Sequence, residues 1–429
     1  MPTIAYHTLG CKVNQYETEK IRESMEKAGC KSVPFSSYAD AYLINTCSVT
    51  AVADSKSRAA VRKALRLNPD AFIVVTGCYA DIEPAQIRSF EGVGLVVAHD
   101  EKDAIAERLA AHFGISDLRH TASGMQPRPR TRTRAVVKVQ DGCDQFCAYC
   151  VIPYARAGRK SRLVPNILDE LRSLADFGYQ EIVLAGIRLG SYEDGDMRLP
   201  ELITKAAEID GIMRIRLSSI EPWEVSDHLL DVMNDPKVCR HLHIPLQSGD
   251  SDVLARMNRP YDAKEYDRII SRVRERIDGI GITTDVIVGF PGETDREFAN
   301  TCAMIERVDF SRLHVFRYSP RPRTKAADMT GQVDAETKRV RAEKLSKLGN
   351  DAMMRFATSH IGKTLEVLVE TASGKGSKAS GKSGVQLTGY ADNYLSVVFE
   401  CDLALRGSIA GIEIVGVDND GCARGLVRY

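Results

Sequence analysis

The chain has 429 residues, of which 44% are hydrophobic and 27% are charged. This length exceeds one average domain and suggests two to four, and the composition is ordinary for a soluble globular protein. Lysine plus arginine and aspartate plus glutamate both number 58, so the overall charge gives no sign of a nucleic-acid partner. Any basic surface must therefore be local.

The N-terminal stretch MPTIAYHTLGCKVNQYETEK lacks the charged region and long apolar run of a signal peptide. No apolar segment approaches the ~18 residues that a membrane span needs. We therefore expect a cytoplasmic protein with no membrane partner. In that compartment, cysteines act as metal ligands or buried thiols more often than as disulfides, and the chain has 11 of them.

The first part of the chain alternates strand-like and helix-like segments, which predicts a parallel sheet with helices on both faces. The expected strands are Thr3–Thr8, Ala41–Asn45 and Phe72–Val75. The expected helices are Glu17–Ala28, Ala51–Leu67, Pro84–Phe90 and Ala104–Phe113.

Three cysteines follow the three expected strands. Cys11, Cys47 and Cys78 each come two or three residues after a strand-like run. Because ligands gather at the carboxyl ends of parallel strands, we expect these thiols to meet at one sheet edge as a ligand set. The alternative is three unrelated core cysteines, since free cysteine is often buried.

The middle of the chain predicts an incomplete parallel barrel. Its six strand-like runs are Ala135–Val139, Glu181–Ala185, Met213–Leu217, His241–Leu246, Ile282–Val288 and Leu313–Tyr318. Helical segments separate them at Ile167–Phe177, Leu202–Ile209, Glu224–Met233, Ala263–Ile277 and Asp295–Val308. Before the first strand, residues 121–134 contain four arginines, two prolines and no acid, which indicates an extended linker and a candidate phosphate contact.

A compact C-x3-C-x2-C motif follows the first barrel strand. Cys143, Cys147 and Cys150 together offer three thiolates, whereas iron–sulfur clusters normally take four. One iron of a cluster held here would stay open for a small molecule. A zinc site or a disulfide knot is the alternative, but zinc sites prefer a second cysteine pair, and this chain has no other C-x-x-C.

The C-terminal part changes character. A charged helical connector at Asp334–Ser359 precedes five short strands, which suggest a small β-barrel of the OB-like kind. Residues 373–384 are rich in Gly, Ser and Lys and fit a hairpin tip. The expected strands are Thr364–Val369, Val385–Tyr390, Tyr394–Phe399, Ile409–Val417 and Ala423–Arg428.

With these motifs assembled, the sequence resembles the methylthiotransferase family of radical S-adenosylmethionine (SAM) enzymes along nearly the whole chain. Within that family it is most similar to the branch that acts on N6-threonylcarbamoyladenosine in tRNA. The strings that carry the resemblance are TLGCKVNQYETE at Thr8–Glu19, INTCSVT at Ile44–Thr50, QDGCDQFCAYCVIPYAR at Gln140–Arg156, LGSY at Leu189–Tyr192 and RLSSIEP at Arg216–Pro222.

The resemblance implies an α/β fold in three parts. These are an N-terminal open parallel α/β domain at residues 1–117, a partial (β/α)6 radical SAM barrel at 135–359 and a C-terminal five-stranded TRAM β-barrel at 360–429. Residues 118–134 would form the linker. The family has Gly directly after the PYAR string, whereas this chain has Ala157 and then Gly158, so the loop geometry there is open.

The resemblance also implies two 4Fe–4S clusters and two roles for SAM. Cys143, Cys147 and Cys150 would be the catalytic ligands of one cluster, whose open iron binds SAM and starts a 5′-deoxyadenosyl radical. Cys11, Cys47 and Cys78 would hold the second cluster, which carries the sulfur. The methylthio group would be delivered to C2 of the adenine.

Residues at the ends of the later barrel strands fit SAM binding in the same family. Ordinary barrel-loop turns are the alternative interpretation for each. The expected cofactor-binding residues are Gly186, Ser219, Glu221, Gln247, Gly289 and Gly292. Basic residues near strand ends are candidates for tRNA phosphate contacts, with solvated charge as the alternative. They are Arg156, Arg159, Arg162, Arg317, Arg321 and Arg323.

The expected partners are the anticodon stem-loop of a tRNA, SAM and an electron donor such as a flavodoxin or ferredoxin. Two alternatives stay within the family: methylthiolation of N6-isopentenyladenosine in tRNA, or of a ribosomal protein. A third is a non-enzymatic RNA-binding iron–sulfur protein. From Ile361 onward, seven Lys/Arg stand against eight Asp/Glu, which is a weak footprint for RNA binding by the C-terminal barrel.

Overall fold

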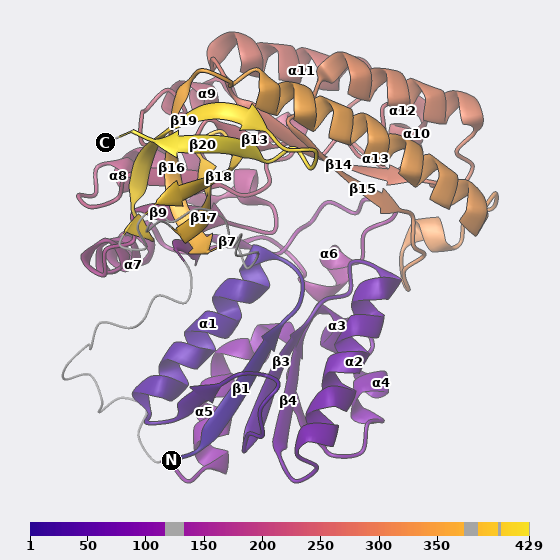
Figure 1. Ribbon diagram of the computed structural model, residues 1–429. Coiled ribbons are helices and arrows are strands. Elements are labelled where there is room, and N and C mark those ends of the chain that lie inside the picture. The colour runs from indigo at the N-terminus through magenta and orange to yellow at the C-terminus, as the bar shows by residue number, and fades with distance from the viewer. Residues whose placement is uncertain (116–132, 373–384, 402–404, 429) are drawn as a thin grey trace. The chain divides into compact units, whose positions relative to one another are not determined.

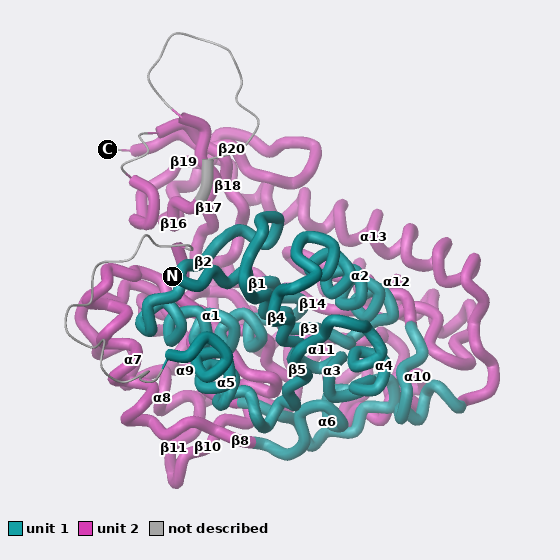
Figure 2. Tube along the Cα trace, turned by 90° about the horizontal axis from the view of Figure 1, so that it is seen from below, with its two compact units in different colours: residues 1–128, 141–159, 319–328 teal, residues 129–140, 160–318, 329–429 magenta. Residues whose placement is uncertain are grey.

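The computed structural model describes residues 1–115, 133–372, 385–401 and 405–428 (Figure 1). The chain divides into two compact units, which Figure 2 shows in different colours. The first comprises residues 1–128, 141–159 and 319–328, and the second comprises 129–140, 160–318 and 329–429. The C-x3-C-x2-C loop therefore belongs to the same unit as the N-terminal sheet.

The first unit contains a five-stranded sheet in the order β2-β1-β3-β4-β5, and every strand pair is parallel. The predicted parallel α/β fold is confirmed. The edge strands β2 and β5 were not predicted, because three or four residues give too short a pattern. The strands are β1 Thr3–Thr8, β2 Lys31–Val33, β3 Ala41–Thr46, β4 Phe72–Gly77 and β5 Val93–Val96.

Helices cover both faces of this sheet, as Figure 1 shows. Side chains of successive strand residues point to opposite faces, so each strand feeds two apolar layers. Leu43 packs with Ile21 and Leu109 on one face, and Ile44 packs in the layer on the other face. The elements of this unit are α1 Lys12–Lys27, α2 Ala51–Leu67, α3 Cys78–Ile82, α4 Pro84–Arg88, η1 His99–Ala104, α5 Ile105–His112, α6 Ile152–Ala155 and η4 Lys325–Ala327.

The second unit contains six parallel strands in chain order. They form two three-stranded sheets that a parallel bridge between Ser219 and His243 joins. This arrangement confirms the predicted incomplete barrel, with β6 and β15 as its two edges. The strands are β6 Arg134–Lys138, β9 Glu181–Ala185, β12 Arg214–Leu217, β13 His241–His243, β14 Gly281–Val288 and β15 Arg312–Arg317.

Helices pack on the outer face of these strands. Residues of β14 alternate strictly: Ile282, Val286 and Val288 join the apolar core, whereas Asp285 points the other way. The helices are α7 Val164–Asp176, α8 Leu199–Ala207, α9 Asp227–Val232, α10 Ser251–Arg256, α11 Ala263–Arg276, α12 Asp295–Val308 and α13 Ala335–Thr358. Short elements are β7 Gln140–Asp141, β8 Lys160–Ser161, η2 Leu189–Ser191, β10 Glu193–Asp194, β11 Met197–Arg198 and η3 Pro222–Glu224.

The C-terminal part of the second unit is a closed five-stranded barrel in the order β16-β17-β18-β20-β19, as predicted. Its core contains Val367, Leu387, Val397 and Ile412. The predicted hairpin tip at residues 373–384 lies outside the described residues, as does most of the predicted basic linker. The strands are β16 Thr364–Ala372, β17 Val385–Ala391, β18 Ser396–Cys401, β19 Ile409–Val417 and β20 Ala423–Val427.

A buried arginine connects the two β structures of this unit. Arg216 on β12 donates to Glu181 Oε1 at 2.7 Å and to the backbone carbonyls of Ala391 and Asp392 at 3.1 and 2.9 Å. A buried charge is tolerated only when it is paired and hydrogen-bonded, and both conditions hold here. The C-terminal barrel is thereby fixed to the parallel strands. Among the described residues, no helix has the length and apolar character to cross a membrane.

Candidate active site

The strand order brings three cysteines to one edge of the N-terminal sheet. Cys11 precedes α1 directly after β1, Cys47 follows β3, and Cys78 opens α3 directly after β4. Because β1, β3 and β4 are neighbours and parallel, their carboxyl ends lie side by side. The three thiols therefore converge on one region of the first unit.

Two glycines allow the loops with these cysteines to approach one another. Gly10 has a φ of +93°, and a Cβ placed there would lie 2.8 Å from Cys47 Sγ. Gly77 has a φ of +96°, and its Cβ would lie 2.5 Å from Asn45 Oδ1. Such conformations and close approaches favour glycine. The side chain of Asn14 joins the same loops by donating to the carbonyls of Leu9 and Thr46 at 2.8 and 3.0 Å.

The thiols influence one another electrostatically. Burial, with smaller contributions from the nearby thiols of Cys78 and Cys11, raises the pKa of Cys47 to about 11. Cys11 keeps solvent contact on one side, but the protein packed around its thiol raises its pKa, and the Arg156 guanidinium opposes that rise. Burial therefore disfavours the thiolate forms of Cys11 and Cys47, and a metal bound there would have to displace their protons.

The second cysteine set lies on a tight loop of the same unit. Cys143 donates its backbone N–H to the carbonyl of Arg156 at 3.1 Å, and the backbone N–H of Cys150 bonds the carbonyl of Cys147 at 3.0 Å. Gly142 has a φ of +72°, and a Cβ there would collide with the carbonyl oxygen of Gly158. Gly158, which follows Ala157 in this chain, also has a φ of +72°.

An apolar cluster connects the two cysteine sets. Cys78 and Ile82 pack with Val151 and Ala155, which belong to the turn and to helix α6 after Cys150. All four residues are buried. One member of the N-terminal set, Cys78, therefore shares a buried apolar environment with the residues that follow Cys150.

The same unit contains a buried network of hydrogen bonds and salt bridges centred on Arg156. Arg156 donates to Glu17 Oε1 and Oε2 at 3.0 and 3.1 Å, to Asp141 Oδ1 at 2.7 Å and to Asn14 Oδ1 at 2.6 Å. Lys102 forms a buried salt bridge with Glu17. Burial alone would lower the pKa of Arg156, but Glu17, Cys78 and Asp141 outweigh it, so the pKa rises and the guanidinium stays charged.

The burial of two arginines corrects their interpretation as tRNA phosphate contacts. The side chain of Arg156 is fully buried, and that of Arg321 is 3% exposed. Arg321 bonds Ser48 Oγ at 2.8 Å and pairs with Asp54. Neither side chain reaches a surface that an RNA backbone could contact. Their partners were not singled out from the sequence, although Asn14 and Glu17 lie inside the string that carries the family resemblance.

The residues expected to bind SAM lie in the second unit, at the carboxyl ends of four barrel strands. Gly186 follows β9, Ser219 follows β12, and Gly289 follows β14. Gln247 comes after β13 with a φ of +63° and is almost fully buried. Gly289 and Gly292 have φ values of +71° and +74°. This is the edge where barrels of this kind place their active sites.

Two of these residues have carboxylate contacts that limit their roles. Glu221 pairs with the buried Arg259, so its carboxylate is already engaged. The backbone N–H of Gly289 donates to Glu293 Oε2 at 2.6 Å, and Arg341 holds that same carboxylate at 2.7 Å. These contacts stabilise the loop after β14.

A histidine–aspartate group crosses three neighbouring barrel strands. Asp285 on β14 lies 3.3 Å from His243 Nε2 on β13 and 3.1 Å from His314 Nδ1 on β15. His243 Nδ1 lies 2.9 Å from the hydroxyl of Thr283. Burial would raise the pKa of Asp285, but the hydrogen bonds from both histidines hold it well below its usual value of 3.8. The carboxylate is therefore ionised at neutral pH.

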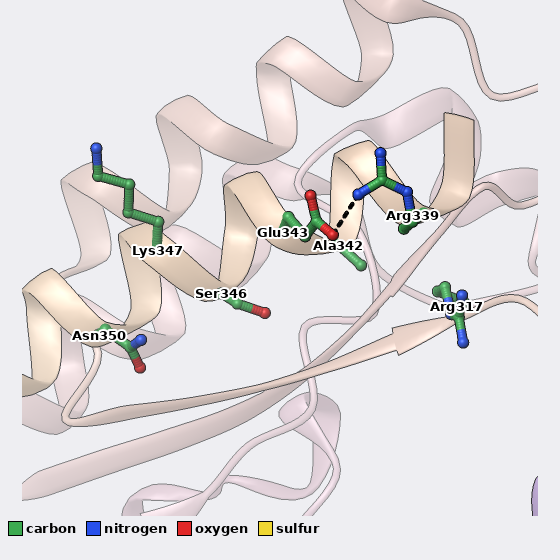
Figure 3. A pocket seen from close by; sticks show the side chains of 7 residues that line it. All are labelled: Arg317, Arg339, Ala342, Glu343, Ser346, Lys347 and Asn350. Atoms are coloured by element: carbon green, nitrogen blue, oxygen red, sulfur yellow. Dashed lines mark hydrogen bonds and ion pairs between the residues drawn. The ribbon is translucent and has the colours of Figure 1, made fainter. Parts of the chain in front are cut away.

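A shallow pocket of about 510 Å³ lies between β15 and α13 (Figure 3). Arg317 and Lys347 are exposed cations in its wall, and Arg339 is occupied by Glu343. Arg317 is thus one predicted phosphate contact that the structure leaves accessible. The pocket is lined by Arg317, Arg339, Ala342, Glu343, Ser346, Lys347 and Asn350.

Comparisons with known families agree with this geometry. Residues 3–98 match the model of the uncharacterized protein family UPF0004, and residues 137–305 match that of the radical SAM superfamily. A solved radical SAM methyltransferase, TsrM from Kitasatospora setae with cobalamin and a [4Fe-4S] cluster bound, has a similar fold. The TM-score is 0.57 at 16% identity, over 76% of this chain and 77% of that one. Together with the parallel half-barrel, these matches define the class as radical SAM enzymes.

Relatives with assigned activities narrow the class. The threonylcarbamoyladenosine tRNA methylthiotransferase MtaB of Bacillus subtilis is 38% identical over 97% of this chain and 94% of its own length. The protein of the same name from Thermotoga maritima is 36% identical over 93% and 92%. A tRNA-2-methylthio-N(6)-dimethylallyladenosine synthase of a Thermoanaerobacter species is 35% identical over 95% and 90%. The chain belongs to the tRNA methylthiotransferase family of radical SAM enzymes and is a transferase.

Proposed function

We propose that the protein adds a methylthio group to C2 of N6-threonylcarbamoyladenosine next to the anticodon of tRNA. The product is 2-methylthio-N6-threonylcarbamoyladenosine. One observation supports this choice of substrate: the MtaB protein of Bacillus subtilis is 38% identical to this chain, whereas the Thermoanaerobacter dimethylallyladenosine synthase is 35% identical. Both cover nearly the whole chain, so the dimethylallyl substrate is the second candidate.

The residues present fit two iron–sulfur clusters. Cys143, Cys147 and Cys150 would hold one, and Cys11, Cys47 and Cys78 would hold the other. Each set provides three soft thiolate ligands and leaves one iron without a cysteine, as a cluster that binds a further ligand requires. The two clusters and SAM supply the radical that activates adenine C2 and the sulfur and methyl group of the product.

The chain's own residues hold the cysteine loop in place, shield a thiol from water and offer a binding site for SAM. Val151 and Ala155 pack with Cys78 in a buried apolar cluster, which shields that thiol from water. Arg156 and its carboxylate partners fix the C-x3-C-x2-C loop to helix α1. Gly186, Ser219, Glu221, Gln247, Gly289 and Gly292 are the proposed SAM-binding residues, at the barrel edge where the backbone can approach a ligand.

We place the tRNA contacts of the second unit at the pocket of Figure 3. Arg317 at the end of β15 and Lys347 on α13 are two exposed cations that line this pocket. Contacts of this kind add affinity without reading sequence, which suits an enzyme that must position a loop. An electron donor such as a flavodoxin or ferredoxin would reduce the protein, which we expect to act in the cytoplasm.

An anaerobic assay with reconstituted protein tests the proposal. A chain with two 4Fe–4S clusters holds about eight iron and eight sulfide ions. Incubation with SAM, a reductant and tRNA that carries N6-threonylcarbamoyladenosine should yield the methylthiolated nucleoside and 5′-deoxyadenosine. Turnover of the dimethylallyl substrate instead would move the protein to the sister branch. Absence of 5′-deoxyadenosine from SAM under reducing conditions would favour a binding protein.

A further inference from the structure

One N–H group of the buried Arg156 side chain has no hydrogen-bond partner among the described residues. The four terminal N–H donors of Arg156 face Glu17, Asp141, Asn14 and His99. The fifth donor, Nε–H, is shielded from solvent, and no acceptor among the described residues lies within hydrogen-bonding distance. Guanidinium groups present five donors, and buried donors are nearly always satisfied. This N–H is therefore available to an acceptor that the described residues do not provide.

The surroundings of Arg156 identify the chemistry of that acceptor. Its guanidinium acts electrostatically on the thiols of Cys78 and Cys11, two members of the N-terminal cysteine set. Cys78 also packs against Ala155, the residue before Arg156. The oxygen atoms of Glu17, Asp141 and Asn14 accept hydrogen bonds from the terminal nitrogens of Arg156 and not from its Nε. A sulfur atom is the acceptor that this location supplies once the cysteines hold their metal.

The charge balance of the network allows such a bond. Two carboxylates, Glu17 and Asp141, face two cations, Arg156 and Lys102. The network is thus neutral in itself, and Arg156 is held rigidly by bonds on both terminal nitrogens. A charged N–H donor that is already held in place stabilises an anionic sulfur more than a mobile donor does, because no conformational entropy is lost when the hydrogen bond forms.

We propose that Arg156 is a positioning residue whose Nε–H donates a hydrogen bond to a sulfur atom of the iron–sulfur group at Cys11, Cys47 and Cys78. This inference rests on the proposed function, because it requires a cluster at that set. Hydrogen bonds to cluster sulfurs are one of the levers that set reduction potential. Arg156 would make the N-terminal cluster easier to reduce and would hold its sulfur in a fixed direction.

Nitrogen-15 spectroscopy on the full-length chain tests this bond. The variant Cys143→Ala/Cys147→Ala/Cys150→Ala confines the paramagnetic signal to the N-terminal set. Protein labelled with [15N]arginine is reconstituted, reduced and studied by pulsed electron paramagnetic resonance. We expect a 15N hyperfine coupling in the natural Arg156 background. Arg156→Lys should abolish this coupling and shift the reduction potential of the N-terminal cluster to a more negative value. Arg58→Lys is the matched control, since Arg58 donates to Tyr79, the residue after Cys78, at 2.8 Å.

The outcomes separate this inference from the function on which it rests. Iron at the N-terminal set without a 15N coupling, or with a coupling that survives in Arg156→Lys, would overturn the role of Arg156 alone. Absence of iron from that set would overturn the two-cluster function and this inference with it. If Arg156→Lys does not fold, labelled Arg321→Lys decides. A 15N coupling that persists in both Arg321→Lys and Arg58→Lys supports Arg156 as the donor. Loss of the coupling in either of these variants contradicts that assignment.

Discussion

Arg156 donates hydrogen bonds from both terminal nitrogens to the two carboxylate oxygens of Glu17, at 3.0 and 3.1 Å. The residues are 139 positions apart in the chain, and both are buried. Paired bonds of this kind are the strongest that arginine makes with a carboxylate. They fix the C-x3-C-x2-C loop to helix α1, whose N-cap is Cys11, so one contact couples the geometry of both cysteine sets.

We expect Glu17→Gln to destabilise the protein by about 3–5 kcal/mol, because it leaves Lys102 buried without its carboxylate and Arg156 with only that of Asp141. Denaturant unfolding of the metal-free chain measures this change. Glu23→Gln is the control: its pair with Lys20 is partly exposed, and such pairs contribute ~1 kcal/mol or less. Equal effects of the two substitutions would show that burial of the Glu17 network does not matter.

Gly142→Ala should remove the iron held by the C-x3-C-x2-C loop. Its Cβ would collide with the backbone carbonyl of Gly158, and the backbone at Cys143 must shift. We expect iron and sulfide to fall by about half, as loss of one of two 4Fe–4S clusters requires. Gly158→Ala is the control, because its φ is also positive but no atom lies within 4 Å of the new Cβ. That substitution should cost about 1–2 kcal/mol of stability and retain iron.

The sequence predicted the strand ends well because periodicity and chain order decide them. Three strand-like runs followed by cysteine implied one sheet edge, and β1, β3 and β4 are indeed neighbours. Burial of charge was not predictable in the same way. Arg156 looks like any loop arginine in the chain, and only the fold brings Glu17 and Asp141 to it. Charged residues are almost never fully buried unless paired, so its exposure was the reasonable expectation.

Asp285→Asn should weaken the barrel in a pH-dependent way. The pKa of Asp285 is lower in the folded protein than its usual value of 3.8. Its ionised form therefore stabilises the fold at pH values above 3.8, and this stabilisation is lost as the pH falls below 3.8. We expect a loss of about 1.5–3 kcal/mol at neutral pH, as for hydrogen bonds to a charged group.

Unfolding measured between pH 7 and pH 3 tests this expectation. The difference between the natural chain and Asp285→Asn should shrink as the pH falls below about 4. Asp267→Asn removes an exposed pair with Arg307 and should change stability by less than ~1 kcal/mol at every pH. A constant difference for Asp285→Asn would contradict the ion-paired carboxylate.

Arg317→Ala/Lys347→Ala should weaken tRNA binding through phosphate contacts. Each lost contact reduces the slope of log K against log salt by about 1, and affinity falls similarly for all tRNA sequences. Titrations at several salt concentrations measure both quantities. Arg276→Ala, which removes an exposed cation paired with Asp231, is the control and should leave the slope unchanged. An unchanged slope for the double variant would place the tRNA elsewhere.

Nucleoside analysis of tRNA from a strain that lacks this protein tests the central claim most directly. Mass spectrometry of the hydrolysed tRNA compares the deletion strain with the same strain complemented by the natural chain or by a Cys147→Ala variant. We predict that 2-methylthio-N6-threonylcarbamoyladenosine disappears, that N6-threonylcarbamoyladenosine accumulates, and that only the natural chain restores the product. Unchanged levels of this nucleoside, or loss of the methylthiolated isopentenyladenosine instead, would contradict the account.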